Sequence, residues 1–152
     1  EGRIDRAKLG ARVFNNLDQL RRLEEIIHPI VAAHKYQFIK TASRRRAPFV
    51  VLDVPLLFET GGDAACDAVV TVSAPEFVQT RRVLARPGMD RRRLDQILEK
   101  QMPDVEKRRR SDFIVPTGLG RLESMRTIRK IINKVSAWPA RRWPPWVVRR
   151  SL

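Results

Sequence analysis

The stretch FVVLDVPLLFE, residues 49–59, decides the fold prediction for this chain. Its first part, FVVLD, is apolar up to Asp53 and shows no polar alternation, which predicts a strand buried on both faces, as strands of parallel sheets are. The strand has to end at Pro55, which has no N–H to donate to a neighbouring strand. Asp53 and Glu59 therefore flank the carboxyl end of the predicted strand, where open α/β sheets bind their ligands.

The rest of the chain alternates helical and strand patterns. Strands are predicted at residues 68–72 and 112–115, and helices at residues 4–14, 17–28, 29–42, 76–86, 94–101 and 122–135. This alternation predicts an α/β fold with a parallel sheet. Pro29 predicts a helix end near His28 and the first turn of another helix. The pattern S-A-P-E at residues 73–76 predicts a capping box with Ser73 as the cap.

The charge of the chain is strongly positive. It has 31 Lys and Arg residues against 17 Asp and Glu residues, a formal net charge of +14. This excess predicts an anionic partner, which is nucleic acid, an acidic membrane surface or a phosphorylated small molecule. Charge alone leaves these three open.

Other features of the composition exclude several classes of protein. Cys66 is the only cysteine and His28 and His34 are the only histidines, so neither an intrachain disulfide nor a structural zinc site is expected. No apolar run approaches the roughly 20 residues that span a bilayer, and the charged start EGRIDRAKLG does not fit a signal peptide. We therefore expect a cytoplasmic protein without a membrane partner. Because the chain starts without methionine inside a helical pattern, we also expect its true beginning to lie upstream.

Two arginines are candidates for phosphate binding. Arg82 and Arg86 are four residues apart on one helix face, where two guanidinium groups can converge on phosphate oxygens. Pro87-Gly88 and the run Arg91-Arg92-Arg93 follow, a pattern typical of a mobile flap that closes over a polyphosphate. The alternative is an ordinary solvated helix face.

Three other residues have both a chemical and a structural interpretation. Asp53 resembles the strand-end Asp that positions magnesium in phosphate-loop nucleotidases, but many buried strands end in Asp. Glu59 is placed to orient a hydroxyl group or to cap the following turn. His28 is a candidate base or a hydrogen-bonded histidine at a helix end.

Taken in order, the motifs of the chain resemble those of the dephospho-coenzyme A kinase family. The matching pieces are IDRAKLGARVF (4–14), LEEIIHP (23–29), VPLLFE (54–59), Q-x-x-R-x-x-x-R (79–86), ILEKQMP (97–103) and SDFIVPTG (111–118). Each piece alone is a weak signal, whereas the ordered set, spread over most of the chain, is specific.

The resemblance implies a phosphate-loop kinase-type fold, in which a parallel sheet lies between two helical layers, with a helical substrate domain and a lid. The sheet would be incomplete, because the first strands are not in this sequence. The implied parts are a coenzyme A-binding part at 1–45, core sheet at 46–86 and 111–136, and a lid at 87–110. The tail at 137–152, rich in Trp, Pro and Arg, has no counterpart and is expected to be disordered.

The resemblance also implies a function, the ATP-dependent phosphorylation of the 3′-hydroxyl of dephospho-coenzyme A, with ATP and Mg²⁺ as cofactors and no nucleic-acid partner. It implies that Arg82 and Arg86 stabilise the transferring phosphate. The acceptor residues would be Arg6, His28, Pro55, Leu56 and Glu59, and the ATP-binding residues Arg86, Pro116 and Thr117. Asp53 is the one candidate metal ligand.

The 152 residues depart from the family in one major respect, because they contain no G-x-x-x-x-G-K-[ST] phosphate loop. The family's catalytic Asp also lies upstream, so we expect the chain alone to be inactive. One alternative is a basic nucleic-acid-binding module using Trp138, Trp143 and Trp146. It is disfavoured because the folded part is expected to contain no tryptophan. A non-functional partial gene product is a further alternative, compatible with the kinase interpretation.

Overall fold

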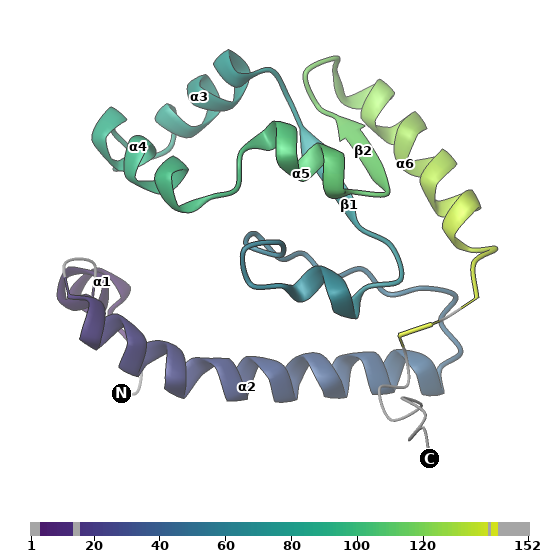
Figure 1. Cartoon of the computed structure of the whole chain (residues 1–152), viewed down its shortest axis with the longest axis horizontal. Coiled ribbons are helices and arrows are strands. Elements are labelled where there is room, and N and C mark those ends of the chain that lie inside the picture. Colours follow the sequence, from purple (N-terminus) through teal and green to yellow (C-terminus); the bar gives the residue numbers. More distant parts are fainter. Residues whose placement is uncertain (1–3, 14–15, 140, 143–152) are drawn as a thin grey trace. The chain divides into compact units, whose positions relative to one another are not determined.

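The computed structural model describes residues 4–13, 16–139 and 141–142 (Figure 1). Its elements are α1 (Arg6–Val13), α2 (Leu17–Arg44), the 3₁₀ helix η1 (Gly62–Ala65), β1 (Val70–Ser73), α3 (Glu76–Leu84), α4 (Arg91–Lys100), α5 (Asp104–Arg110), β2 (Phe113–Pro116) and α6 (Arg121–Val135). The chain divides into two compact units, residues 1–51 and 52–152, which are described separately.

The first unit consists of α1 and the 28-residue helix α2. Asn16 caps α2, since its Oδ1 accepts hydrogen bonds from the backbone N–H groups of Asp18 and Gln19, both at 3.1 Å. The predicted break at Pro29 is wrong, because α2 runs through this proline. The segment EIIHPIVAA around it offers no capping residue. A break would therefore leave the orphan groups of two helix ends without partners, whereas an internal proline removes a single N–H.

The buried strand predicted at residues 49–53 does not form, and these residues are a loop. Val51 is 75% exposed and Phe49 is 40% exposed. A strand requires a neighbour that supplies ladder hydrogen bonds, and β1 and β2, the two strands of the described residues, pair only with each other. The apolar pattern of this segment is therefore that of a buried strand, while its conformation is that of a loop.

The two strands form a parallel pair in which Val70 lies opposite Phe113 and Ser73 lies opposite Pro116. The predictions of strands at 68–72 and 112–115 are confirmed, with bounds shifted by one or two residues. The strands are joined by a crossover through α3, α4 and α5, as parallel pairing demands.

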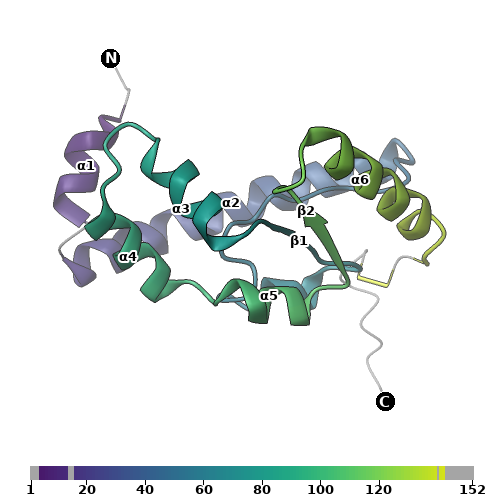
Figure 2. The same ribbon diagram turned by 90° about the horizontal axis from the view of Figure 1, so that it is seen from above.

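Helices cover both faces of the strand pair (Figure 2). Thr71 and Ser73 hydrogen-bond to residues of α5 or its C-terminal end, Asp104 and Ser111, so this face lies toward α5. Successive strand residues point to opposite faces, and α6 packs against β2 on the other side. The buried core is small and comprises Phe58, Val69, Leu94 and Val115, with the polar Thr71 and Ser73. The predicted α/β class with a parallel sheet is confirmed.

Two predictions about α3 are wrong. Ser73 is not its cap, because Ser73 is the last residue of β1 and its Oγ donates to Asp104 Oδ2 at 2.8 Å. Pro75 precedes α3 and makes no side-chain cap. The helix also ends at Leu84, so Arg86 lies in the following turn, where its N–H donates to the carbonyl of Val83 at 3.0 Å. The downstream carboxylate attracts the Ser73 hydroxyl away from the backbone N–H groups that it was predicted to cap.

The segment after α6 is partly described, and Trp138 belongs to the folded part. Its ring lies 5.6 Å from that of Phe113, centroid to centroid. Asp67 Oδ1 accepts hydrogen bonds from the N–H groups of Arg141 and Arg142 at 2.7 and 2.9 Å. The expectation of a folded part without tryptophan is therefore wrong. Trp143, Trp146 and the rest of 143–152 lie outside the described residues.

Among the residues that the structure describes, none of the helices combines the length and apolar character needed to cross a bilayer.

Candidate functional site

A small hollow lies at the carboxyl ends of β1 and β2, beside α3. Its volume is about 210 Å³, and it is lined by Val72, Ser73, Ala74, Gln79, Arg82, Val83, Arg86 and Thr117. Ligands of α/β proteins bind at this edge of a parallel sheet. Of the predicted site residues, the structure brings Arg82, Arg86 and Thr117 together here.

Arg82 is engaged by the turn after β2. Its Nη1 donates to Thr117 Oγ1 at 3.2 Å and its Nη2 donates to the Thr117 carbonyl at 2.8 Å. Thr117 is itself tied to the end of β1, since its N–H donates to the Ser73 carbonyl at 2.8 Å and its Oγ1 to the same oxygen at 3.1 Å. The Arg82 guanidinium thus links α3 to the turn after β2, and through Thr117 to the end of β1.

Arg86 is in a different situation. It is exposed, and within the described residues its guanidinium has no hydrogen bond or ion pair. The turn that contains it continues to Gly88, whose φ of 72° favours glycine. The Met89 N–H closes this turn on the Arg86 carbonyl at 3.1 Å. The hollow therefore contains a positive charge that no described acid neutralises.

Two residues that line the hollow, Ser73 and Gln79, are hydrogen-bonded to Asp104, which was not among the predicted site residues. Its Oδ2 accepts from Ser73 Oγ at 2.8 Å, and its Oδ1 lies 3.5 Å from Gln79 Nε2. Gln79 Nε2 also donates to the Ala74 carbonyl at 2.7 Å. The sequence did carry a signal for this residue, since an acid directly after Pro103 is typical of a helix start. Gln79, which was recognised as a motif residue, thereby links α3 to Ala74 and Asp104.

The turn after β2 is closely packed. The Pro116 carbonyl accepts from Ser124 Oγ at 2.7 Å. A Cβ atom at Gly118 would lie only 2.8 Å from Pro75 Cδ, so glycine is required there for steric reasons. Pro116 is the last residue of β2 and does not line the hollow.

Glu59 lies outside the lining of the hollow and is held by other residues of the second unit. Its Oε1 accepts from the Met102 N–H at 2.7 Å and lies 3.0 Å from Lys107 Nζ. Its Oε2 is buried without a hydrogen-bond partner in the described part of the chain. Burial alone would raise the pKa of this carboxyl group, but hydrogen bonds from backbone N–H groups and from Lys107 outweigh it and lower the pKa below its ordinary value.

The other predicted residues do not line the hollow. Asp53, Pro55 and Leu56 lie on the exposed loop that leads to Glu59. His28 is exposed on α2, in the first unit. Arg6 begins α1, and its side chain lies outside the described part. The described residues contain no group of three or more His, Cys, Asp or Glu side chains that could hold a metal ion.

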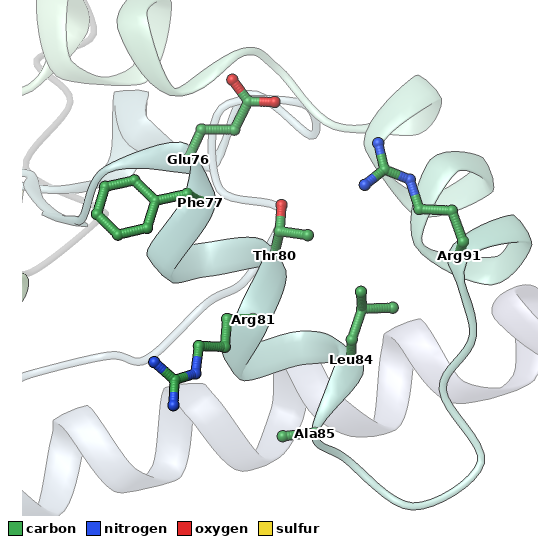
Figure 3. A pocket seen from close by; sticks show the side chains of 7 residues that line it. All are labelled: Glu76, Phe77, Thr80, Arg81, Leu84, Ala85 and Arg91. Atoms are coloured by element: carbon green, nitrogen blue, oxygen red, sulfur yellow. The ribbon is translucent and has the colours of Figure 1, made fainter.

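A second, shallower hollow lies on the other side of α3 and reaches Arg91 of α4 (Figure 3). Its volume is about 910 Å³, and Glu76, Phe77, Thr80, Arg81, Leu84, Ala85 and Arg91 line it. None of the predicted site residues is among them.

Comparison with known proteins gives one consistent family. The family model of dephospho-CoA kinase matches residues 1–119. The dephospho-CoA kinase of Rhodopseudomonas palustris (strain BisB18) is 49% identical over 142 residues, which cover 93% of this chain and 71% of that protein. The dephospho-CoA kinase of Mesorhizobium japonicum is 50% identical over 135 residues, 89% of this chain and 68% of the relative.

Solved structures agree with this result. TT1252 from Thermus thermophilus superposes with a TM-score of 0.72 at 34% identity, covering 88% of this chain and 68% of that chain. The dephospho-CoA kinase from Campylobacter jejuni superposes with a TM-score of 0.63 at 26% identity, covering 90% and 67%. The predicted kinase-type α/β fold class is thereby confirmed.

Proposed function

The chain belongs to the dephospho-CoA kinase family, and from that membership we propose that its protein transfers the γ-phosphate of ATP to the 3′-hydroxyl of dephospho-coenzyme A. This is the reaction that the resemblance of the motifs implied. The chain spans 71% of the length of the Rhodopseudomonas relative.

The observation that supports this function is the hollow between the strand ends and α3. A volume of about 210 Å³ is below the usual range for a complete drug-sized ligand, but it can accommodate phosphate groups. Two guanidinium groups line it, and one of them is without a described partner. Such groups stabilise charge that redistributes over phosphate oxygens in the transition state.

We propose that the ATP site includes Arg86 and the turn at Pro116 and Thr117. Both carbonyls of this turn already accept one side-chain hydrogen bond, from Ser124 and from Arg82 respectively. A carbonyl has two lone pairs, so an adenine amino group would use the second one. The backbone rather than side chains would then recognise the base.

Arg6, His28, Pro55, Leu56 and Glu59 are proposed for the acceptor, on the resemblance of the motifs that contain them. For Glu59 the role would be indirect, because Oε1 is occupied by Met102 and Lys107. The carboxylate would then hold the VPLLFE loop in place for its neighbours.

Kinases of this type use Mg²⁺. Asp53 is the one residue of this chain proposed as a ligand of this ion; it lies on the exposed loop before Glu59, and the described residues contain no group of three metal-ligating side chains beside it.

The test is a fusion protein in which the phosphate-loop segment of the Rhodopseudomonas relative precedes this chain. We expect this fusion protein to form coenzyme A from dephospho-coenzyme A in an ATP-dependent reaction. The products are measured by chromatography. The unmodified relative is the positive control and the 152-residue chain is the negative control. A fusion protein that folds, as judged by circular dichroism, but produces no coenzyme A would contradict the proposed function.

A further inference from the structure

We propose that the two arginines of the Q-x-x-R-x-x-x-R motif have different roles. Arg82 is a positioning residue that holds the turn after β2, and Arg86 is the cation that contacts phosphate. This inference rests on the proposed function and refines it, because the resemblance of the motifs implied that both residues stabilise the transferring phosphate.

The hydrogen bonds of Arg82 support the first half. Both terminal nitrogens of its guanidinium donate to Thr117, one to the hydroxyl and one to the carbonyl. The Thr117 hydroxyl both accepts from Arg82 and donates to the Ser73 carbonyl, which uses its single donor. Arg82 therefore acts on ATP binding indirectly, because it fixes the backbone of the turn that would contact the adenine.

The surroundings of Arg86 support the second half. It lines the same hollow four residues further along the chain, yet its guanidinium has no partner in the described part of the chain. The turn that contains it ends α3 and includes Gly88 at positive φ. A guanidinium that breaks no existing hydrogen bond on binding contacts an anion more readily than one that must leave Thr117.

The two roles predict different responses to two probes. Inorganic tripolyphosphate carries the charge of ATP without the base, so its affinity should depend on Arg86 alone. ATP should bind more tightly than tripolyphosphate, and this difference should depend on Arg82 through Thr117. Arg81 provides a control of equal charge, because it lies next to Arg82 but lines the hollow on the other side of α3 (Figure 3).

The first measurement needs no ligand. Hydrogen exchange of the Thr117 amide, which bonds to the Ser73 carbonyl, is followed in the fusion protein described above, whose folding is checked by circular dichroism. We expect about tenfold faster exchange in Arg82→Ala, an intermediate rate in Arg82→Lys, and rates within about twofold of the parent in Arg81→Ala and Arg86→Ala. The amides of β2 report any general loss of structure. Unchanged exchange at Thr117 in Arg82→Ala would overturn the positioning role.

The second measurement is a ³¹P NMR titration with millimolar tripolyphosphate or ATP, without magnesium. We expect Arg86→Ala to weaken both probes about tenfold, and Arg82→Ala to affect tripolyphosphate no more than Arg81→Ala does while removing the preference for ATP. Thr117→Val, which removes the hydroxyl contact, should lower that preference without affecting tripolyphosphate.

Equal losses of tripolyphosphate affinity in Arg82→Ala and Arg86→Ala would make both residues phosphate ligands. That result would overturn the division of roles and leave the proposed function standing. No binding of tripolyphosphate by the parent chain would overturn the role of Arg86 and the proposed phosphate site together. The exchange rate of Thr117 would then still decide the role of Arg82.

Discussion

Glu59 and Lys107, far apart in the sequence, form an ion pair at 3.0 Å whose side chains are only 16% and 18% exposed. The same Glu59 oxygen accepts the Met102 N–H at 2.7 Å. Lys107 belongs to α5, and Met102 lies between α4 and α5. The VPLLFE loop is therefore fastened to the end of the predicted lid.

Loss of this carboxylate should loosen the junction between α4 and α5. A hydrogen bond to a charged group contributes about 2 kcal/mol, so we expect Glu59→Gln to speed exchange of the Met102 amide about 30-fold. Glu99→Gln, at an exposed position of α4, is the matched control and should leave that rate unchanged. Equal rates in both variants would show that the ion pair contributes nothing to local stability.

The contribution of Glu59 should also depend on pH. The pKa of Glu59 is lowered in the folded chain, so its stabilisation is fully present above the ordinary pKa that the group has in the unfolded chain. It is lost as the pH falls through the folded value. The ratio of Met102 exchange rates between Glu59→Gln and the parent should thus be constant from about pH 5 upward and approach one in acid. A ratio of exchange rates that increases at acid pH would contradict the stabilising role of the ionised Glu59.

The 152-residue chain should melt without a sharp transition and bind a hydrophobic dye. None of the described side chains is less than 2% exposed, while Val51, Val72 and Phe77 are 75%, 65% and 73% exposed. Because so little apolar surface is buried, the free energy gained from burial does little to offset the loss of conformational entropy on folding. Calorimetry and dye fluorescence are the measurements. A sharp two-state melt of a monomer would show that the chain is a complete domain.

The same chain should bind Mg-ATP weakly and transfer no phosphate, because its 152 residues contain no phosphate loop. Calorimetric titration should find no micromolar binding. An assay with dephospho-coenzyme A should find no product. Micromolar affinity together with turnover would mean that residues of this chain replace the phosphate loop.

In the fusion protein, Arg86→Ala should lower kcat on the order of 10³-fold while raising KM for dephospho-coenzyme A far less. Arg86→Lys should recover only part of the loss, because an ammonium cannot make a two-pronged contact. Arg91→Ala is the control, since Arg91 pairs with Asp95 at 3.2 Å and is 68% exposed, and kcat should change little. Similar, near-parental kcat values for both alanine variants would make Arg86 an ordinary surface charge.

Local patterns were sufficient for much of the fold. The apolar runs around Val70 and Phe113 predicted β1 and β2, and the helical spacing of Leu122, Met125 and Ile128 predicted α6. The helix pattern works because a helix forms its hydrogen bonds between residues a few positions apart. The two strand patterns work because the two apolar runs pair with each other. The ordered motifs also indicated the family, which the comparisons confirm.

Partners distant in the sequence could not be predicted in this way. The segment 49–53 has the composition of a buried strand, yet it has no neighbouring strand among the described residues and remains a loop. Ser73 has the pattern of a helix cap, yet its hydroxyl bonds to Asp104. In both cases the local pattern indicates which structure a residue can adopt or which bond it can form. The partner that the fold brings close determines which of these occurs.

The four-residue spacing of Arg82 and Arg86 in the sequence was enough to predict a phosphate site that includes both residues. Only the tertiary structure distinguished the two, by placing Thr117, 35 residues further along the chain, against Arg82 and no described partner against Arg86. Hydrogen bonds form only between groups that the fold brings within about 3 Å of each other, and this proximity depends on the packing of the chain and not on the spacing of residues along it.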